Sequence, residues 1–351
     1  MSTFDNIQSN QHFQAPSDWL RIKTIDMHTG GEPLRVILNG LPELNGNSVL
    51  DYRRYMKENH DHLRTALMFE PRGHADMYGC ILVPPNDHEA DFGILFLHNE
   101  GYSTMCGHAV IAITTLAVQM GWVKVKEPET QVVIDAPCGR IYSYAKVEGG
   151  TVTSVYFHCV PSFVADQDCI VEVDGIGQVK YDLAYGGAFY AYVDADELGI
   201  DMTPENYRQL IEKGMAIKHA VIESNDRIIH PFEPEMSELY GTIFTGESHT
   251  AGVDSRNVCI FAAGEVDRSP TGSGVSGRMA IHHKRGDLNI GETMSVESII
   301  GSSFVGSVHK EEKYGPFDAV IPQVEGTAHI VGQNEFLIDP NDPLKDGFIL
   351  R

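Results

Sequence analysis

Short apolar runs, separated by turns rich in glycine, asparagine and aspartate, dominate the chain from Trp19 onward. Runs of about four to eight apolar and β-branched residues bounded by such turns are typical of β-strands. They include RVILNG, GCILVPP, FGILFLHN and QVVIDAPCG in the first half, and IVEVDG, AVIES, YGTIFTG and RNVCIFAAG in the second. Apolar spacing favours helices over Asp51–Phe69 and Pro204–Lys218. The pattern predicts a strand-rich α+β protein with few helices.

Two segments far apart in the chain share one pattern. FGILFLHNEG is followed by YSTMCGHAVIAITTLAVQMGW, and RNVCIFAAGEVD is followed by RSPTGSGVSGRMAIHHKRGDL. In each, a strand-like run leads through a short loop to a glycine, Gly107 or Gly272, that opens an apolar helix. Each helix is expected to stop at a glycine 14 residues later, Gly121 or Gly286, because glycine adopts the left-handed helix-ending conformation without steric penalty. The equal intervals favour two related halves.

The residues before the two opening glycines, Cys106 and Thr271, occupy equivalent places. A helix N-terminus presents unpaired N–H groups and the positive end of a dipole, so two facing N-termini could bind one carboxylate. The dipole would also favour the thiolate of Cys106, which makes it a candidate base or nucleophile. A buried thiol at the start of a helix is the alternative. Cys259, inside the strand-like run NVCIF, is expected to be a buried structural residue.

Other polar residues carry less specific chemistry. Asp267 precedes the second helix and could either cap it or bind a ligand ammonium. The loop residues Glu70, Arg72, His74 and Asp76 are either catalytic or part of a polar turn. HExxH, GxGxxG and GxxxxGK[ST] patterns are missing from the sequence, so we expect no metal, dinucleotide or phosphate-loop site.

Composition and charge limit the classes of partner that the protein is expected to bind. The chain has 351 residues, 42% hydrophobic and 21% charged, as in folded soluble proteins. Its net charge of −23 disfavours nucleic acids and anionic membranes, so the expected partner is a small molecule. The apolar stretch Ala109–Met120 is shorter than the about 20 residues that span a bilayer. The polar leader MSTFDNIQSNQHFQ and six cysteines without a CxxC pair favour the cytoplasm.

Five motifs resemble those of the proline racemase superfamily. MCGHAVIA (Met105–Ala112) is similar to the family's first active-site segment, and DRSPTGSG (Asp267–Gly274) is similar to its second. Three further segments are similar to flanking motifs of the family: EPRGHADMYG (Glu70–Gly79), DMHTGGEPLRV (Asp26–Val36) and AYGGAFYA (Ala184–Ala191). The resemblance runs from about residue 20 to the C-terminus. It implies two similar α/β halves, each a mostly antiparallel, barrel-like sheet around a central helix, with the active site in the cleft between them.

The expected division of the chain follows from this resemblance. Residues 1–18 form a flexible leader, residues 19–160 together with about 328–351 form the first domain, and residues 161–327 form the second. The C-terminal run HIVGQNEFLIDPNDPLKDGFILR is expected to return and complete the first domain. The sequence leaves the oligomeric state open, with a homodimer among the states considered.

The resemblance also implies a reaction without a cofactor or metal. In the racemases two cysteines flank the substrate α-carbon; here Cys106 matches the first, whereas Thr271 stands at the second position. A threonine hydroxyl is too weakly acidic to exchange an α-proton, and no neighbouring base is evident in PTGSG. The threonine variant resembles the branch of trans-3-hydroxy-L-proline dehydratases, which form pyrroline-2-carboxylate. Alternatively, Thr271 only fills space.

By the family's site, substrate-binding groups can be assigned residue by residue. The backbone N–H groups of Gly107, His108, Gly272 and Ser273 would bind the substrate carboxylate, and Asp267 would bind the ring ammonium. These donors would also stabilise charge that moves onto the carboxylate as the α-proton leaves.

The stereochemistry of the expected substrate explains why one cysteine suffices. In trans-3-hydroxy-L-proline the hydroxyl and the α-hydrogen lie on the same face of the ring, so elimination is syn and needs acid and base on one face only. The acid that protonates the leaving hydroxyl stays open: the Cys106 thiol, a water or a nearby group. Two alternatives remain: a proline or hydroxyproline racemase or epimerase, and a non-catalytic imino-acid binding protein.

Overall fold

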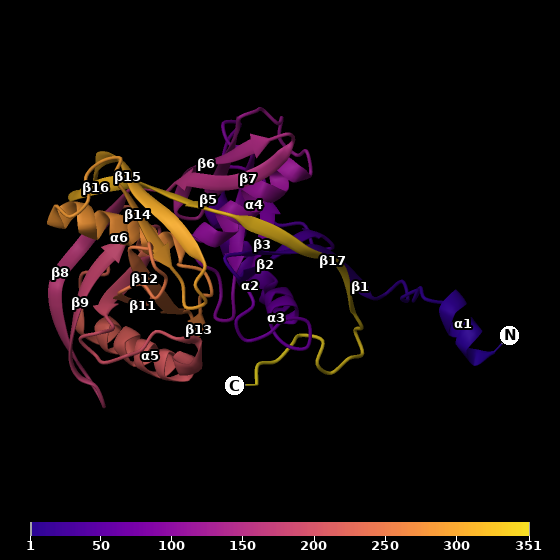
Figure 1. The fold of residues 1–351 in the computed structure, drawn as a ribbon. Helices are drawn as coiled ribbons and strands as arrows, with labels where there is room; N and C mark the ends of the chain where they lie inside the picture. Colours follow the sequence, from indigo (N-terminus) through magenta and orange to yellow (C-terminus); the bar gives the residue numbers. More distant parts are fainter. Residues whose placement is uncertain (1, 351) are drawn as a thin grey trace.

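Two closed rings of strands, each with a helix inside, make up most of the molecule (Figure 1). The computed structural model describes residues 2–350. Its helices are α1 (Thr3–Ser9), α2 (Val49–Asn59), α3 (Asp61–Met68), α4 (Gly107–Gln119), α5 (Tyr207–Ser224) and α6 (Gly272–Arg285), with short 3₁₀ turns η1 (Pro204–Asn206) and η2 (Pro234–Met236). Its strands are β1 (Leu20–Thr29), β2 (Glu32–Asn39), β3 (Gly79–Val83), β4 (Phe92–Leu97), β5 (Glu129–Ala136), β6 (Gly139–Glu148), β7 (Thr151–His158), β8 (Ser162–Val173), β9 (Gly177–Tyr185), β10 (Phe189–Asp194), β11 (Leu239–Gly246), β12 (Ser255–Phe261), β13 (Glu265–Val266), β14 (Thr293–Glu297), β15 (Ser303–Tyr314), β16 (Phe317–Gly326) and β17 (Ala328–Ile338).

The first ring runs from β1 to β7 and closes through the last two strands of the chain. β1 pairs with β17 and β2, β7 pairs with β16, and β16 continues into β17 across a single residue. Most neighbours are antiparallel, but β2–β3 and β4–β5 are parallel. Parallel neighbours need a crossover connection, which α2 and α3 supply for the first pair and α4 supplies for the second.

The second ring repeats this plan. β8, β9, β10, β11, β12, β14, β15 and β16 pair in that order, and β16 closes the ring on β8. Its two parallel pairs, β10–β11 and β12–β14, are again bridged by helices, α5 and α6. α4 and α6 therefore hold equivalent places, and both begin at the predicted glycines, Gly107 and Gly272. The predicted strand-rich α+β class is confirmed.

The two central helices are buried because they are surrounded by strands. Every residue of α4 from Gly107 to Val118 is buried, as is every residue of α6 from Gly272 to Ile281. A helix that is apolar on all faces needs such an enclosure. Gly286 ends α6 in the left-handed conformation, with φ at 80°, as the sequence predicts.

Two local predictions are wrong in detail. The stretch Asp51–Phe69 is two helices, because His60, with φ at −136°, interrupts it and α3 starts afresh at Asp61. The run AVIES is the end of α5, which continues to Ser224. Its Val221 belongs to a buried helical stripe with Leu210, Gly214 and Ile217 that the strand-like appearance of AVIES hides.

The termini lie at the periphery of the rings. Figure 1 shows α1 standing apart from the two rings, whereas β17 runs beside β1 with Leu20 opposite Ile338. The expected division into a leader and two domains stays a prediction. Among residues 2–350, no helix is long and apolar enough to cross a membrane.

The starts of α4 and α6 meet in backbone contact. A Cβ atom placed on Gly107 would lie 2.6 Å from the Cα of Gly272, and one placed on Gly272 would lie 2.7 Å from the Cα of Gly107. Real Cβ atoms do not approach other atoms this closely, so only glycine at both positions allows the two helix N-termini to touch.

Replacing Gly107 by alanine tests this contact. We expect Gly107→Ala to lower the free energy of unfolding by about 1–3 kcal/mol, because the added methyl group forces the two helix starts apart. Urea denaturation measures the change. Gly101→Ala is the matched control, since a Cβ there meets no atom within 4 Å. Equal stability of the two variants would contradict the contact.

Candidate active site

A small cavity lies where the two helix N-termini meet. All seven site residues predicted from the sequence lie on its wall: Cys106, Gly107, His108, Asp267, Thr271, Gly272 and Ser273. Five further residues complete the wall: Tyr78, Met105, Tyr190, Tyr240 and Phe261. The structure thus brings together two segments that are more than 150 residues apart in sequence.

Both helices begin at this cavity with backbone N–H groups that have no intrahelical partner. The first hydrogen bond within α4 runs from Val110 N to Cys106 O at 3.1 Å, and the first within α6 runs from Val275 N to Thr271 O at 2.7 Å. The N–H groups of the residues before Val110 and Val275 consequently have no partner inside their helices. Together with the positive ends of two helix dipoles, they form a site suited to a carboxylate.

Cys106 contacts the side chain that follows it by two residues. Its Sγ lies 3.1 Å from Nδ1 of His108. Burial lowers the pKa of His108 to about 3, so the imidazole is neutral and can accept a hydrogen bond from the S–H group.

The Cys106 thiol is protonated, in contrast to the prediction from the helix dipole. Burial raises the pKa of Cys106 well above its usual range, and the negative charge of Asp267 adds to the effect. The N–H of Ala109 acts in the opposite direction but does not outweigh burial. The loss of solvent around the thiol outweighs the helix dipole, which alone would favour the thiolate.

Asp267 and Thr271 are joined directly. The Thr271 Oγ1 hydroxyl donates to Asp267 Oδ2 at 2.8 Å, and Ser269 N donates to Asp267 Oδ1 at 2.7 Å. Burial raises the pKa of Asp267 to about 6 although both hydrogen bonds lower it. A carboxylate that lies outside PTGSG is thus the direct neighbour of the Thr271 hydroxyl. Asp267 does not cap α6.

The backbone of Thr271 is strained. Its φ is 67°, a left-handed conformation that β-branched residues rarely adopt. Thr271 N donates to Ser269 Oγ at 3.2 Å, which together with the bond to Asp267 holds this conformation. Such strain costs about 1–3 kcal/mol and typically persists at functional sites.

The aromatic wall of the cavity was not predicted from the sequence. Ser103 Oγ donates to Met105 O at 3.0 Å, so its single proton is used and the Tyr78 hydroxyl, 2.8 Å away, donates to Ser103. Tyr240 Oη lies 3.4 Å from Tyr78 Oη, and Tyr190 Oη lies 2.7 Å from Ser273 Oγ. Tyr78 and Tyr190 stand inside two of the motifs named above, but tyrosines in or beside strands look like ordinary core residues in a single sequence.

The loop around Asp76 supports the site from outside. Asp76 Oδ2 accepts from Arg268 Nη2 at 3.0 Å, and the buried Glu32 accepts from Arg268 N at 2.7 Å. Both contacts fix the residue next to Asp267. Glu70, Arg72, His74 and Asp76 do not line the cavity. In the part of the chain that the structure describes, no group of three or more His, Cys, Asp or Glu residues is arranged to bind a metal.

Comparisons with known proteins agree on the family of this chain. A family model described as proline racemase matches residues 24–349. Trans-3-hydroxy-L-proline dehydratase from Colwellia psychrerythraea is 53% identical over 333 residues, covering 95% of this chain and 94% of that protein. The dehydratase of the same name from Azospirillum brasilense is 47% identical over 330 residues, covering 94% and 98%. The crystal structure of a hydroxyproline epimerase from Agrobacterium vitis with bound trans-4-hydroxy-L-proline has a TM-score of 0.87 at 33% identity, covering 94% of this chain and 96% of that one.

Substitution of Thr271 tests its bond to Asp267. We expect Thr271→Ala to destabilise the protein by about 1–3 kcal/mol at about pH 8, because a buried carboxylate loses a donor. Asp267 is charged above its pKa of about 6 and protonated below it. A hydrogen bond to the charged form is the stronger one, so the destabilisation should shrink at about pH 5. Urea unfolding at both pH values measures it.

Thr271→Ser is the matched control, since it keeps the hydroxyl and should keep most of the stability at both pH values. A destabilisation by Thr271→Ala that does not depend on pH would show that the bond to Asp267 contributes nothing.

Proposed function

The chain belongs to the proline racemase family, and we propose that it removes water from trans-3-hydroxy-L-proline to give pyrroline-2-carboxylate. This makes it a hydro-lyase rather than a racemase. One observation carries the proposal. The cavity has a thiol at the first position, Cys106, and a hydroxyl at the second, Thr271, and this hydroxyl donates to Asp267. A hydroxyl engaged in this way does not exchange an α-proton.

The substrate is a zwitterion, and the cavity offers a partner for each charge. Its carboxylate binds the free N–H groups of Gly107, His108, Gly272 and Ser273 at the two helix N-termini. Its ring ammonium binds the carboxylate of Asp267. This arrangement places the α-carbon between Cys106 and Thr271.

Substrate binding prepares Cys106 for its role as base. In the empty cavity, burial and the charge of Asp267 keep the thiol protonated. The substrate ammonium neutralises Asp267 and adds positive charge to the same buried space, so it favours the thiolate. The reactive form of Cys106 is therefore coupled to occupancy of the site.

The elimination proceeds on one face of the ring. The Cys106 thiolate takes the α-proton, the electron pair left on the α-carbon forms the double bond to C3, and the C3–O bond breaks. The new Cys106 thiol lies on the same face and returns its proton to the departing hydroxide, which leaves as water. The enamine product then rearranges to pyrroline-2-carboxylate. These steps balance without a cofactor, and the N–H groups stabilise charge on the carboxylate as the proton leaves.

The state of the cysteines fits a reducing compartment. All six are free and five are buried. We therefore place the enzyme in the cytoplasm, with a small imino acid as its partner.

Loss of the thiol tests the assignment of the base. Cys106→Ser is expected to abolish conversion of trans-3-hydroxy-L-proline, because a serine hydroxyl is not ionised at neutral pH. Trapping the ketimine product with an aromatic amino-aldehyde measures turnover across a panel of proline and hydroxyproline isomers. Cys169→Ser, at a half-buried cysteine outside the cavity, should retain full activity. Turnover by Cys106→Ser would refute the mechanism.

A thiol at position 271 should restore proton exchange on the face of the substrate ring opposite Cys106. Thr271→Cys is expected to exchange the α-proton with solvent and to invert part of the substrate. Deuterium incorporation at the α-carbon and chiral analysis of the recovered imino acid in heavy water measure this, with Thr271→Ser as control. Complete inertness of a folded Thr271→Cys protein would count against the position of Thr271 opposite Cys106.

A further inference from the structure

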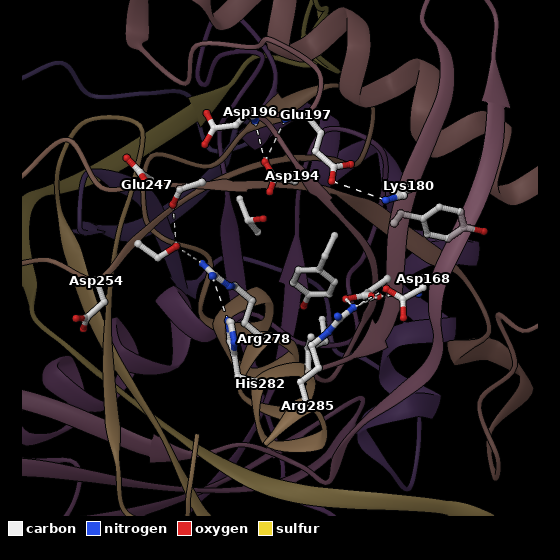
Figure 2. A pocket seen from close by; sticks show the side chains of 17 residues that line it. Asp168, Lys180, Asp194, Asp196, Glu197, Glu247, Asp254, Arg278, His282 and Arg285 are labelled. Carbon is white, nitrogen blue, oxygen red and sulfur yellow. Dashed lines mark hydrogen bonds and ion pairs between the residues drawn. The ribbon is translucent and has the colours of Figure 1, made fainter. Parts of the chain in front are cut away.

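A second, larger cavity opens at the other end of α6. It is open to solvent and lies between α6 and strands β9 to β12 (Figure 2). Its wall includes His282 and Arg285 near the C-terminus of α6, whereas Gly272 and Ser273 at the N-terminus line the active site. The proposed reaction makes no use of it.

Arg278 is the unusual residue of this cavity. Its side chain is buried, with 7% of the residue exposed. Nη1 donates to Ser255 Oγ at 2.8 Å and to Asn257 Oδ1 at 2.9 Å, and Nη2 lies 3.2 Å from His282 Nε2. These bonds use three of the five N–H donors of a guanidinium. Among residues 2–350, no carboxylate lies within 4 Å of it.

The neighbouring histidine does not compensate this charge. Because a guanidinium only donates, His282 accepts on Nε2 and carries its proton on Nδ1, which lies 3.6 Å from Asp287 Oδ2. Burial and the charge of Arg278 lower the pKa of His282, so the ring is neutral. Arg278 is left as a buried cation without an anion.

The outer wall carries the opposite charge. In Figure 2, Asp194, Asp196 and Glu197 lie across the opening from Arg278, with Glu247 and Asp254 to one side. The two basic residues nearby are already paired. Lys180 lies 3.9 Å from Glu197. Arg285 lies 3.0 Å from Asp168 and 2.9 Å from Asp182. In the described chain Asp194, Asp196, Glu247 and Asp254 form no ion pair.

We propose that this cavity binds a small zwitterion, with its carboxylate on Arg278 and its ammonium group among the outer carboxylates. A carboxylate takes two N–H groups of a guanidinium at once, and Arg278 has two left to offer. A polyanion would be repelled by the outer wall, and a metal ion would be repelled by Arg278. The zwitterion matches both charges.

Binding of the zwitterion would affect the active site through three consecutive contacts. It binds Arg278, Arg278 donates to Asn257 Oδ1, and Asn257 Nδ2 donates to Pro270 O at 3.1 Å. Pro270 precedes the strained Thr271. Arg278 and Asn257 are thus positioning residues for Thr271, and this part of the proposal rests on the proposed function.

Calorimetry with three linear probes tests the binding site without reference to turnover. 6-Aminohexanoate, with both charges, should bind the full-length protein. Hexanoate and 1,6-diaminohexane each carry only one kind of charge and should bind more weakly. Arg278→Gln should weaken the binding of 6-aminohexanoate about tenfold or more, because it removes a charge-assisted pair. Lys284→Gln, at an exposed position on the same helix, is the matched control and should change nothing.

A second variant keeps the test valid if Arg278→Gln fails to fold. Glu247 is exposed at the outer wall, so Glu247→Gln should leave the fold intact. It should weaken the binding of 6-aminohexanoate and leave the binding of hexanoate unchanged. Equal binding of the three probes, or binding that neither substitution affects, would overturn the site. With binding established, 6-aminohexanoate should change the KM for trans-3-hydroxy-L-proline; an unchanged KM would overturn the link to Thr271 alone.

Discussion

The contact between Gly107 and Gly272 is the constraint on which the rest of the structure depends. Each ring of strands encloses one helix, and each helix begins at a glycine that touches the other. A side chain at either position would separate the two N-termini and with them the two sets of free N–H groups. The site is therefore made by the junction of the halves, and neither half holds it alone.

This junction reverses the electrostatics of the protein locally. The chain carries a net charge of −23, yet the cavity is lined by N–H groups at the positive ends of two helices. Burial raises the pKa of both Cys106 and Asp267, so the empty site disfavours its own negative charges. In the proposed mechanism a zwitterionic substrate supplies the missing positive charge, and the reactive thiolate would then form only when a substrate is bound. A protonated thiol is a poor nucleophile, so the resting enzyme is also shielded from oxidation and alkylation.

Features set by local geometry were predictable from the sequence, whereas features set by burial and distant contacts were not. The starts of α4 and α6, the glycine that ends α6 and the seven residues at the helix junction follow from short motifs. The direction of the Cys106 pKa shift was predicted wrongly because solvent exclusion arises only when both rings close around it. Tyr78, Tyr190 and Tyr240 come from three separate strands or loops, and no spacing in the sequence connects them. The break at His60 and the helical run AVIES depend on which neighbours each segment packs against.

The bond between Thr271 and Asp267 explains how one residue can decide between two reactions. Thr271 adopts a left-handed backbone that directs Oγ1 to Asp267, so its proton stabilises a carboxylate in place of reaching the substrate. A cysteine at this position would present a weaker donor, and Asp267 would then accept or return the proton of a thiol that is acidic enough to exchange it. Under the proposed function, the same two positions would support proton transfer on both faces with cysteine, and on the Cys106 face alone with threonine. Dehydration needs only that face when the leaving hydroxyl lies beside the α-proton.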